Sequence, residues 1–217
     1  MSRVVVVSTH LDDAVFSCWS VIADTRLDVS VVTVFTAGRP GVQSAWDALL
    51  EPRIDSLARA AERRAEDSAA LARAGRAPVH LPFYDGQFGP TDADRLVEAL
   101  APIVEQTELV YAPLAIANDE HVVIREAVRQ VCPRPVFYVD YPYALRSPAE
   151  PQDAPAGLLD AYEAQMVELG GTAAAAKVAA ALEYSGELRR LEPDFGVFTT
   201  AEKLGRETYF VPSSTVD

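Results

Sequence analysis

The chain has 217 residues, of which 49% are hydrophobic, and this length can bury one large core without disulfide staples. The formal net charge is −13 and no basic face is evident, which argues against a nucleic-acid partner. No apolar run approaches the ~20 residues of a membrane span, and the N-terminus lacks a signal-peptide pattern, so we expect a cytoplasmic protein.

Strand and helix patterns alternate along the first two thirds of the chain. Short apolar, β-branched runs predict strands at residues 4–8, 28–35, 78–83, 108–113 and 134–141. Helical patterns lie between them at about 13–23, 54–74 and 91–106, and a fourth ends at about 131. The helix near 91 opens with Thr91 and Asp94 at capping-box spacing. The two cysteines, Cys18 and Cys132, fall in apolar helical patterns and predict reduced core residues.

The chain after about residue 150 changes character. Helical patterns at about 158–191 precede two candidate late strands, "GVFTT" and "TYFVP". We predict an α/β fold that is Rossmann-like and three-layered, with a mainly parallel sheet flanked by helices. A single domain would span residues 1–217, with a helical C-terminal extension over about 150–217.

Polar residues gather at the predicted strand ends, where open α/β sheets bind ligands. His10, Asp12 and Asp13 follow the first strand, and His121 follows the fourth. His10 and Asp13 are three residues apart and can converge, and a histidine from the fourth loop can join them. Two histidines and one carboxylate with an open position form a catalytic zinc pattern. Asp12 would then be a candidate general base.

The residues alone leave other interpretations open. Aspartates often cap helices, and a histidine at a strand end is often structural, as we interpret His80 inside the third strand. Mixed charges in "RRAED" and "ELRRLE" are typical of solvated helix faces. A receiver-like phospho-acceptor domain would use the acidic pair for Mg²⁺ and Asp85 as acceptor. It needs a lysine after the fifth strand, where the sequence is "YPYALRSP".

Five segments, in order, resemble the PIG-L/LmbE-like zinc-dependent deacetylases over roughly residues 4–190. "THLDDAV" is similar to the family's "HPDDE" signature, in the "HLDDAV" form of one branch. The other four are "VTVFTAGRP", "WD" at 46–47, "RRAED" at 63–67 and "YVDYPYA" at 138–144. The family typically removes acetyl groups from N-acetylated amino sugars.

This resemblance implies the site and its chemistry. Zn²⁺ would be bound by His10, Asp13 and His121, with Asp12 as general base; Arg63 would face the substrate and Asp85 would hold sugar hydroxyls. The substrate would be a small N-acetylated amino sugar or glycoside, cleaved at its amide by metal-activated water.

The sequence also departs from the family. Leu11 and Ala14 replace the signature's Pro and Glu, and the second motif, usually H-x-D-H, is "NDEH" here. The donor for the developing oxyanion is therefore open, with Tyr141 and Tyr143 as candidates. Trp46 and the "TAGRPG" loop are expected to shape the pocket. The departure also supports an alternative, a non-catalytic sugar-binding or regulatory module with a degenerate metal site. The sequence leaves the oligomeric state open, and a homo-oligomer is one possibility.

Overall fold

The computed structural model describes residues 1–49, 53–147 and 149–213 as one seven-stranded sheet with helices on both faces. The last four residues of the predicted C-terminal extension lie outside this description. The strands are β1 (Arg3–Ser8), β2 (Asp28–Phe35), β3 (Pro78–Phe83), β4 (Leu109–Pro113), β5 (Val136–Tyr138), β6 (Tyr162–Glu168) and β7 (Arg206–Pro212). The α-helices are α1 (Asp13–Ser17), α2 (Trp19–Ile22), α3 (Ser56–Ala72), α4 (Ala93–Val104), α5 (Asp119–Val131), α6 (Gly171–Ala181), α7 (Ser185–Phe195) and α8 (Ala201–Leu204). Three short 3₁₀ turns are η1 (Asp47–Leu49), η2 (Gly86–Phe88) and η3 (Tyr143–Leu145).

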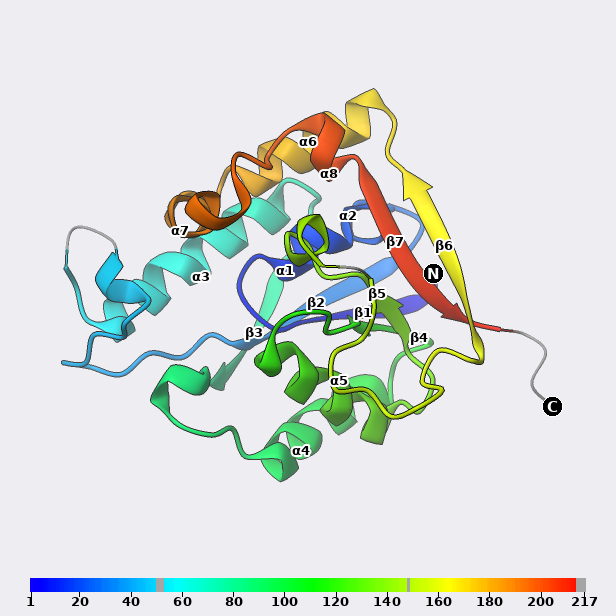
Figure 1. Cartoon of the computed structure of the whole chain (residues 1–217), viewed down its shortest axis with the longest axis horizontal. Helices are drawn as coiled ribbons and strands as arrows, with labels where there is room; N and C mark the ends of the chain where they lie inside the picture. Colours follow the sequence, from blue (N-terminus) through cyan, green and yellow to red (C-terminus); the bar gives the residue numbers. More distant parts are fainter. Residues whose placement is uncertain (50–52, 148, 214–217) are drawn as a thin grey trace.

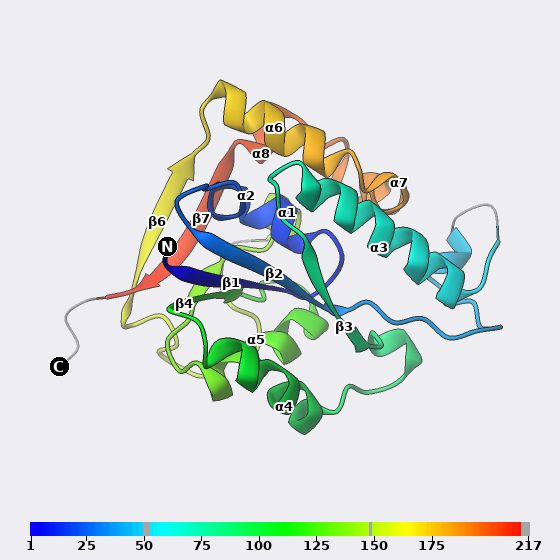
Figure 2. The same cartoon turned by 180° about the vertical axis from the view of Figure 1, so that it is seen from behind.

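The sheet has the order β3-β2-β1-β4-β5-β7-β6, and its first five strands are parallel. Strand β7 runs antiparallel to both β5 and β6. In Figures 1 and 2, α4 and α5 cover one face of the sheet, and α1, α2, α3, α6, α7 and α8 lie on the other. The predicted three-layer Rossmann-like fold is thus confirmed.

The valines of β1 show why this strand occupies the middle of the sheet. Successive side chains in a strand point to opposite faces. Val4 and Val6 belong to the apolar cluster beneath α1, α3, α6 and α7, whereas Val5 and Val7 belong to the cluster beneath α4 and α5. All four are at most 4% exposed, so the continuous apolar run is explained by burial on both faces.

The C-terminal third differs most from its prediction. Strand β6 lies inside the stretch predicted as helix, because seven residues from Tyr162 to Glu168 pair with β7. This ladder overrides the helix-forming Glu, Ala, Gln and Met of the segment. "TYFVP" is confirmed as part of β7, but "GVFTT" is not a strand, and its Phe198 packs into the core instead.

Smaller corrections concern helix starts and breaks. The helix predicted over 13–23 is divided at Cys18 into α1 and α2. Helix α4 is capped by Asp92, which accepts a hydrogen bond from the Arg95 N–H, and not by Thr91. Cys18 and Cys132 are free thiols, the second at the C-cap of α5. Within the described ranges, no helix combines the length and apolar content needed to cross a membrane.

A buried carboxylate of β7 ties the end of the fold to its beginning. Glu207 accepts hydrogen bonds from the Trp19 and Ser20 N–H groups at 2.6 and 3.0 Å, and these are the first two residues of α2. The same side chain pairs with the fully buried Lys177 of α6 at 2.7 Å. Strand β7 therefore completes both the sheet and the helical layer above it.

Candidate active site

The turn between β1 and α1 presents three of the predicted site residues. The Ser8 hydroxyl donates to the His10 carbonyl at 2.7 Å and accepts from the Ala14 N–H at 3.1 Å. Asp12 is the N-cap residue of α1, but its side chain makes no capping hydrogen bond. A carboxylate oxygen of Asp13 instead accepts from the His10 N–H at 2.7 Å. The helix-capping interpretation of these aspartates is therefore wrong.

Helix α5 places the second histidine beside this turn. Asn118 caps the helix by accepting a hydrogen bond from the Glu120 N–H at 2.9 Å, and His121 follows in the first helical turn with 0% exposure. Strands β1 and β4 are neighbours, and the strand order changes direction between them. This switch point is where open α/β sheets bind ligands.

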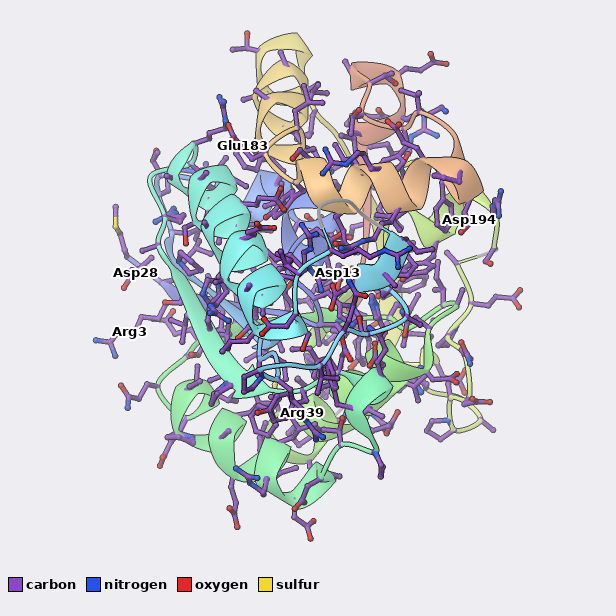
Figure 3. All side chains as sticks on the ribbon, turned by 90° about the vertical axis from the view of Figure 1, so that its left-hand side faces the viewer. Arg3, Asp13, Asp28, Arg39, Glu183 and Asp194 are labelled. Atoms are coloured by element: carbon purple, nitrogen blue, oxygen red, sulfur yellow. The ribbon has the colours of Figure 1, made fainter. Side chains whose placement is uncertain are left out.

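His10, Asp13 and His121 form one cluster with ligand atoms all within 4.8 Å of one another. Asp13 Oδ2 lies 3.4 Å from His10 Nδ1 and 3.3 Å from His121 Nε2. His121 Nε2 is buried and has no hydrogen-bond partner in the described part of the chain. An orphaned imidazole nitrogen beside a carboxylate and a second imidazole fits a metal ion, and this donor set suits zinc. In Figure 3, Asp13 lies near the centre of the molecule, between α3 and α7 on one side and α4 on the other.

Each histidine is held by a carboxylate on its other nitrogen. Glu120 Oε2 lies 2.7 Å from His10 Nε2, and Asp140 Oδ1 lies 2.5 Å from His121 Nδ1. Such partners fix the orientation of metal-binding imidazoles. Neither role was predicted from the sequence. Asp140 lies two residues after the end of β5, at the same sheet edge, and that position was the signal available for it.

The charges of the cluster reinforce one another. Burial lowers the pKa of His10, but the carboxylates of Asp13 and Glu120 outweigh this effect and raise it to about 9. Burial likewise lowers the pKa of His121, but Asp13 and Asp140 raise it well above its usual range. Burial raises the pKa of Asp13, yet the two imidazoles hold it far below its usual value. A cation can take the place of the protons on these imidazoles.

Asp12 has a different environment from Asp13. Its side chain makes no hydrogen bond within the described residues, although the residue is only 6% exposed. Burial raises the pKa of the Asp12 carboxyl well above its usual range, the charge of Asp13 adds to the rise, and that of Arg63 opposes it. The Asp12 carboxyl has no hydrogen-bond partner among the described residues, so it can exchange a proton with a molecule bound beside the cluster.

A cavity of about 560 Å³ opens over the cluster. Its polar lining comprises His10, Asp12, Asp13, Arg63, Asp85, Gln87, Asn118, Glu120 and Glu187. Its other lining residues are Ala45, Trp46, Leu49, Pro142, Tyr143 and Leu191. Most of the lining surface is apolar, so the cavity combines a charged part with an apolar part.

Three of the predicted substrate residues reach this cavity from different elements. Arg63 comes from α3, Trp46 from the loop between β2 and α3, and Asp85 from the N-cap of η2. The solvated-face interpretation of "RRAED" and "ELRRLE" is wrong for Asp67, Glu187 and Arg190, which are buried, and for Arg63, which faces Glu187. The Arg63 and Glu187 side chains are only 14% and 7% exposed, with Arg63 Nε 3.2 Å from Glu187 Oε2.

The two candidate tyrosines have different surroundings. Tyr143 lines the cavity, and its ring packs edge-on against the His121 ring with 5.4 Å between the ring centroids. Its hydroxyl accepts a hydrogen bond from Asn118 Nδ2 at 2.9 Å. Tyr141 lines a separate cavity of about 450 Å³, with Phe16 among its neighbours. The structure therefore places Tyr143 beside His121 at the candidate metal-binding group, whereas Tyr141 lines the other cavity.

His80 has the structural role predicted for it. Its Nε2 lies 2.8 Å from an oxygen of Asp67, a buried residue of α3. The other Asp67 oxygen accepts a hydrogen bond from the Tyr184 hydroxyl at 2.7 Å. This third histidine–carboxylate pair lies outside the candidate metal-binding group of His10, Asp13 and His121.

Known proteins resemble the chain in sequence and in fold. The family described as PIG-L, GlcNAc-PI de-N-acetylase, matches residues 5–132. No curated protein sequence matches the chain. The A40926 pseudoaglycone deacetylase Dbv21 has 24% sequence identity and a TM-score of 0.78, with 100% of this chain and 99% of that chain covered. The zinc-inhibited form of teicoplanin deacetylase Orf2 has 20% identity and a TM-score of 0.80, with 99% and 100% covered.

A third similar structure has another activity. GalB, the 4-carboxy-2-hydroxymuconate hydratase from Pseudomonas putida KT2440, has 17% identity and a TM-score of 0.63, with 100% of this chain and 99% of that chain covered. At these identities the structural likeness shows the fold alone. The reaction must therefore be argued from the site.

Proposed function

Because the chain belongs to the PIG-L family of GlcNAc-PI de-N-acetylases, matched over residues 5–132, we propose that it is a zinc-dependent hydrolase that removes an N-acetyl or other N-acyl group from an amino sugar or glycoside. The observation that carries this proposal is the buried His10–Asp13–His121 cluster. Two of its members, His10 and Asp13, line a cavity together with Asp12, whose carboxyl has no hydrogen-bond partner among the described residues.

His10, Asp13 and His121 would hold the zinc ion. Glu120 and Asp140 orient the two imidazoles and so preset the donors before the metal arrives. When bound, zinc supplies a lowered pKa for its water, toward ~7, and polarises the acyl oxygen.

Asp12 moves the proton in this proposal. Its carboxylate accepts a proton from the attacking water and then delivers it to the amine nitrogen as the amide bond breaks. The elevated pKa of the Asp12 carboxyl suits this exchange, because the group can hold the proton between the two steps. The products are a free amine and a carboxylate such as acetate.

Tyr143 is the donor that we assign to the developing oxyanion. Its hydroxyl already accepts from Asn118 Nδ2, so its own hydrogen is left to donate into the cavity. Asn118 stands at the start of the "NDEH" segment, where the family usually has a histidine. The tyrosine and asparagine together would replace the missing histidine as a donor.

The cavity supports a glycoside with a bulky apolar aglycone as the substrate class. Asp85 and Arg63 offer polar contacts to sugar hydroxyls, and Trp46, Leu49 and Leu191 offer apolar surface. The deacetylases of teicoplanin and of A40926 pseudoaglycone, which share this fold, add support.

The receiver-like alternative loses its basis in the topology. Receiver-type folds have the strand order 2-1-3-4-5, whereas the parallel strands here run β3-β2-β1-β4-β5. The non-catalytic sugar-binding alternative is decided by the experiment that tests the proposal.

The test combines elemental analysis with amine release from a panel of N-acetylated amino sugars and their alkyl and aryl glycosides. We expect a single zinc ion per chain and amine release from the glycosides. His121→Ala should lose both, and His80→Ala is the matched control that should keep the zinc. A zinc-loaded wild type that releases no amine from any member of the panel would contradict the proposal and favour the sugar-binding module.

A further inference from the structure

One carboxylate on α7 contacts side chains from three parts of the chain. Glu187 Oε1 accepts a hydrogen bond from the Trp46 indole N–H at 2.8 Å. Glu187 Oε2 accepts one from Arg190 Nη1 at 2.8 Å and lies 3.2 Å from Arg63 Nε. Glu187 is only 5% exposed and lines the cavity. The C-terminal helix thus supports the substrate cavity with a side chain that is not a metal ligand.

Trp46 depends on these contacts for its position. The guanidinium of Arg190 lies 5.5 Å from the centre of the indole ring. The Trp46 backbone N–H donates to the Gln87 side-chain oxygen at 3.1 Å, and Gln87 Nε2 donates to Asp85 at 3.0 Å. A chain of hydrogen bonds therefore runs along the cavity from α7, through the loop between β2 and α3, to η2.

Arg63 is held at one end only. Its Nε faces Glu187, and its terminal nitrogens make no hydrogen bond to another described residue. The charge of Arg63 acts on Asp12 and Asp85 inside the cavity. Burial raises the pKa of Glu187, but Arg63 and Arg190 hold it below its usual value, so Glu187 stays an anion that can anchor the guanidinium.

We propose that Glu187 is a positioning residue of the substrate site, which fixes the Trp46 indole as a cavity wall and turns the free end of Arg63 toward the bound sugar. The consequence for catalysis rests on the proposed function, whereas the consequence for Trp46 does not. The substitution that tests it is Glu187→Gln. An amide has one acceptor and one donor end, so one of its ends must face an N–H group of Trp46 or of the arginines.

The first experiment follows Trp46 by acrylamide quenching of its fluorescence, taken as the difference between a protein with Trp46 and the same protein carrying Trp46→Phe. The other tryptophan, Trp19, is 1% exposed and serves as a constant background. We expect Glu187→Gln to raise the quenching constant of Trp46 about twofold, because the freed indole gains rotamer freedom. Glu183→Gln is the matched control. Glu183 pairs with Arg73, and Figure 3 shows it well away from Asp13.

The second experiment separates binding from chemistry on an aryl glycoside of an N-acetylated amino sugar. Glu187→Gln should raise KM about tenfold, because this change corresponds to the loss of one charge-assisted hydrogen bond. The kcat should be less affected and the zinc content unchanged. Trp46→Phe, which keeps an aromatic side chain but removes the N–H donor and half of the indole, should raise KM in the same direction. Glu183→Gln should leave both constants unchanged.

Unchanged quenching and unchanged KM in Glu187→Gln would overturn the proposal. Loss of zinc from a folded Glu187→Gln protein would also overturn it, because the residue would then act on the metal site. If Glu187→Gln does not fold, Glu187→Asp decides, because it keeps the charge but withdraws the carboxylate from the Trp46 indole, and unchanged quenching and KM in that variant would overturn the proposal. If the wild type cleaves no acyl sugar, the proposed function fails, and the quenching result still decides whether Glu187 positions Trp46.

Discussion

Replacing Asp140 with asparagine tests whether the outer carboxylates prepare the site for metal. Both oxygens of Asp140 accept hydrogen bonds, one from His121 Nδ1 at 2.5 Å and one from the Ala115 N–H at 2.7 Å. An asparagine has only one acceptor oxygen, so its NH₂ group must face one of these two donors. Either the His121 imidazole then loses the acceptor that orients it, or the loop between β4 and α5 loses the acceptor of the Ala115 N–H.

The size of the effect follows from the bond that is lost. A hydrogen bond to a charged group contributes about 1.5–3 kcal/mol, and about 1.4 kcal/mol is a tenfold change in an equilibrium constant. We therefore expect the Kd for zinc to rise about 10- to 100-fold in Asp140→Asn, the range found for outer partners of metal ligands.

The assay is a zinc titration against a competing chelator, together with thermal unfolding of the metal-free proteins. Asp67→Asn is the matched control, since Asp67 also accepts from a histidine and a second donor, at 2.8 and 2.7 Å, outside the cluster. Asp67→Asn should lower Tm without changing the Kd for zinc. Wild-type zinc affinity in Asp140→Asn, or an equal loss in both variants, would refute the reasoning.

Three further outcomes are expected. Asp12→Asn should keep its zinc while kcat falls roughly 10²- to 10⁴-fold, because only the proton acceptor is lost; zinc loss in elemental analysis would instead make Asp12 a ligand. Tyr143→Phe should lower kcat about 10²-fold as an oxyanion donor, with Tyr141→Phe as the control outside the cavity, and equal rates for the two variants would remove this role from Tyr143. Arg63→Ala and Asp85→Ala should raise KM with zinc content unchanged, and wild-type kinetics in both would show that neither contacts the substrate.

The proximity of His10, Asp13 and His121 could be predicted because it follows from the topology of the sheet. His10 and Asp13 follow one parallel strand and His121 follows its neighbour, so the sheet itself brings them to one edge. The outer carboxylates were harder to assign. Whether Glu120 turns toward His10 depends on a side-chain rotamer that local sequence does not determine.

The C-terminal contribution to the site could not be predicted, for a different reason. Glu187 reaches the cavity only because α7 packs back over α3, a contact between segments far apart in the chain. Its charges resemble those of any surface helix until the partner is known. Strand β6 was missed for the same reason, since its pairing with β7 is invisible in residues 162–168 taken alone.

The partners of the Glu207 carboxylate are all synthesised before Glu207 itself, which bears on how the chain folds during translation. A nascent chain that has emerged only as far as α6 carries Lys177, a residue with 0% exposure in the finished fold, before its counter-charge exists. The Trp19 and Ser20 N–H groups are synthesised far earlier and also lack this acceptor until β7 is made. We therefore expect the helical layer over this edge of the sheet to close only after β7 has been synthesised, because Lys177 and the start of α2 lack their acceptor until then.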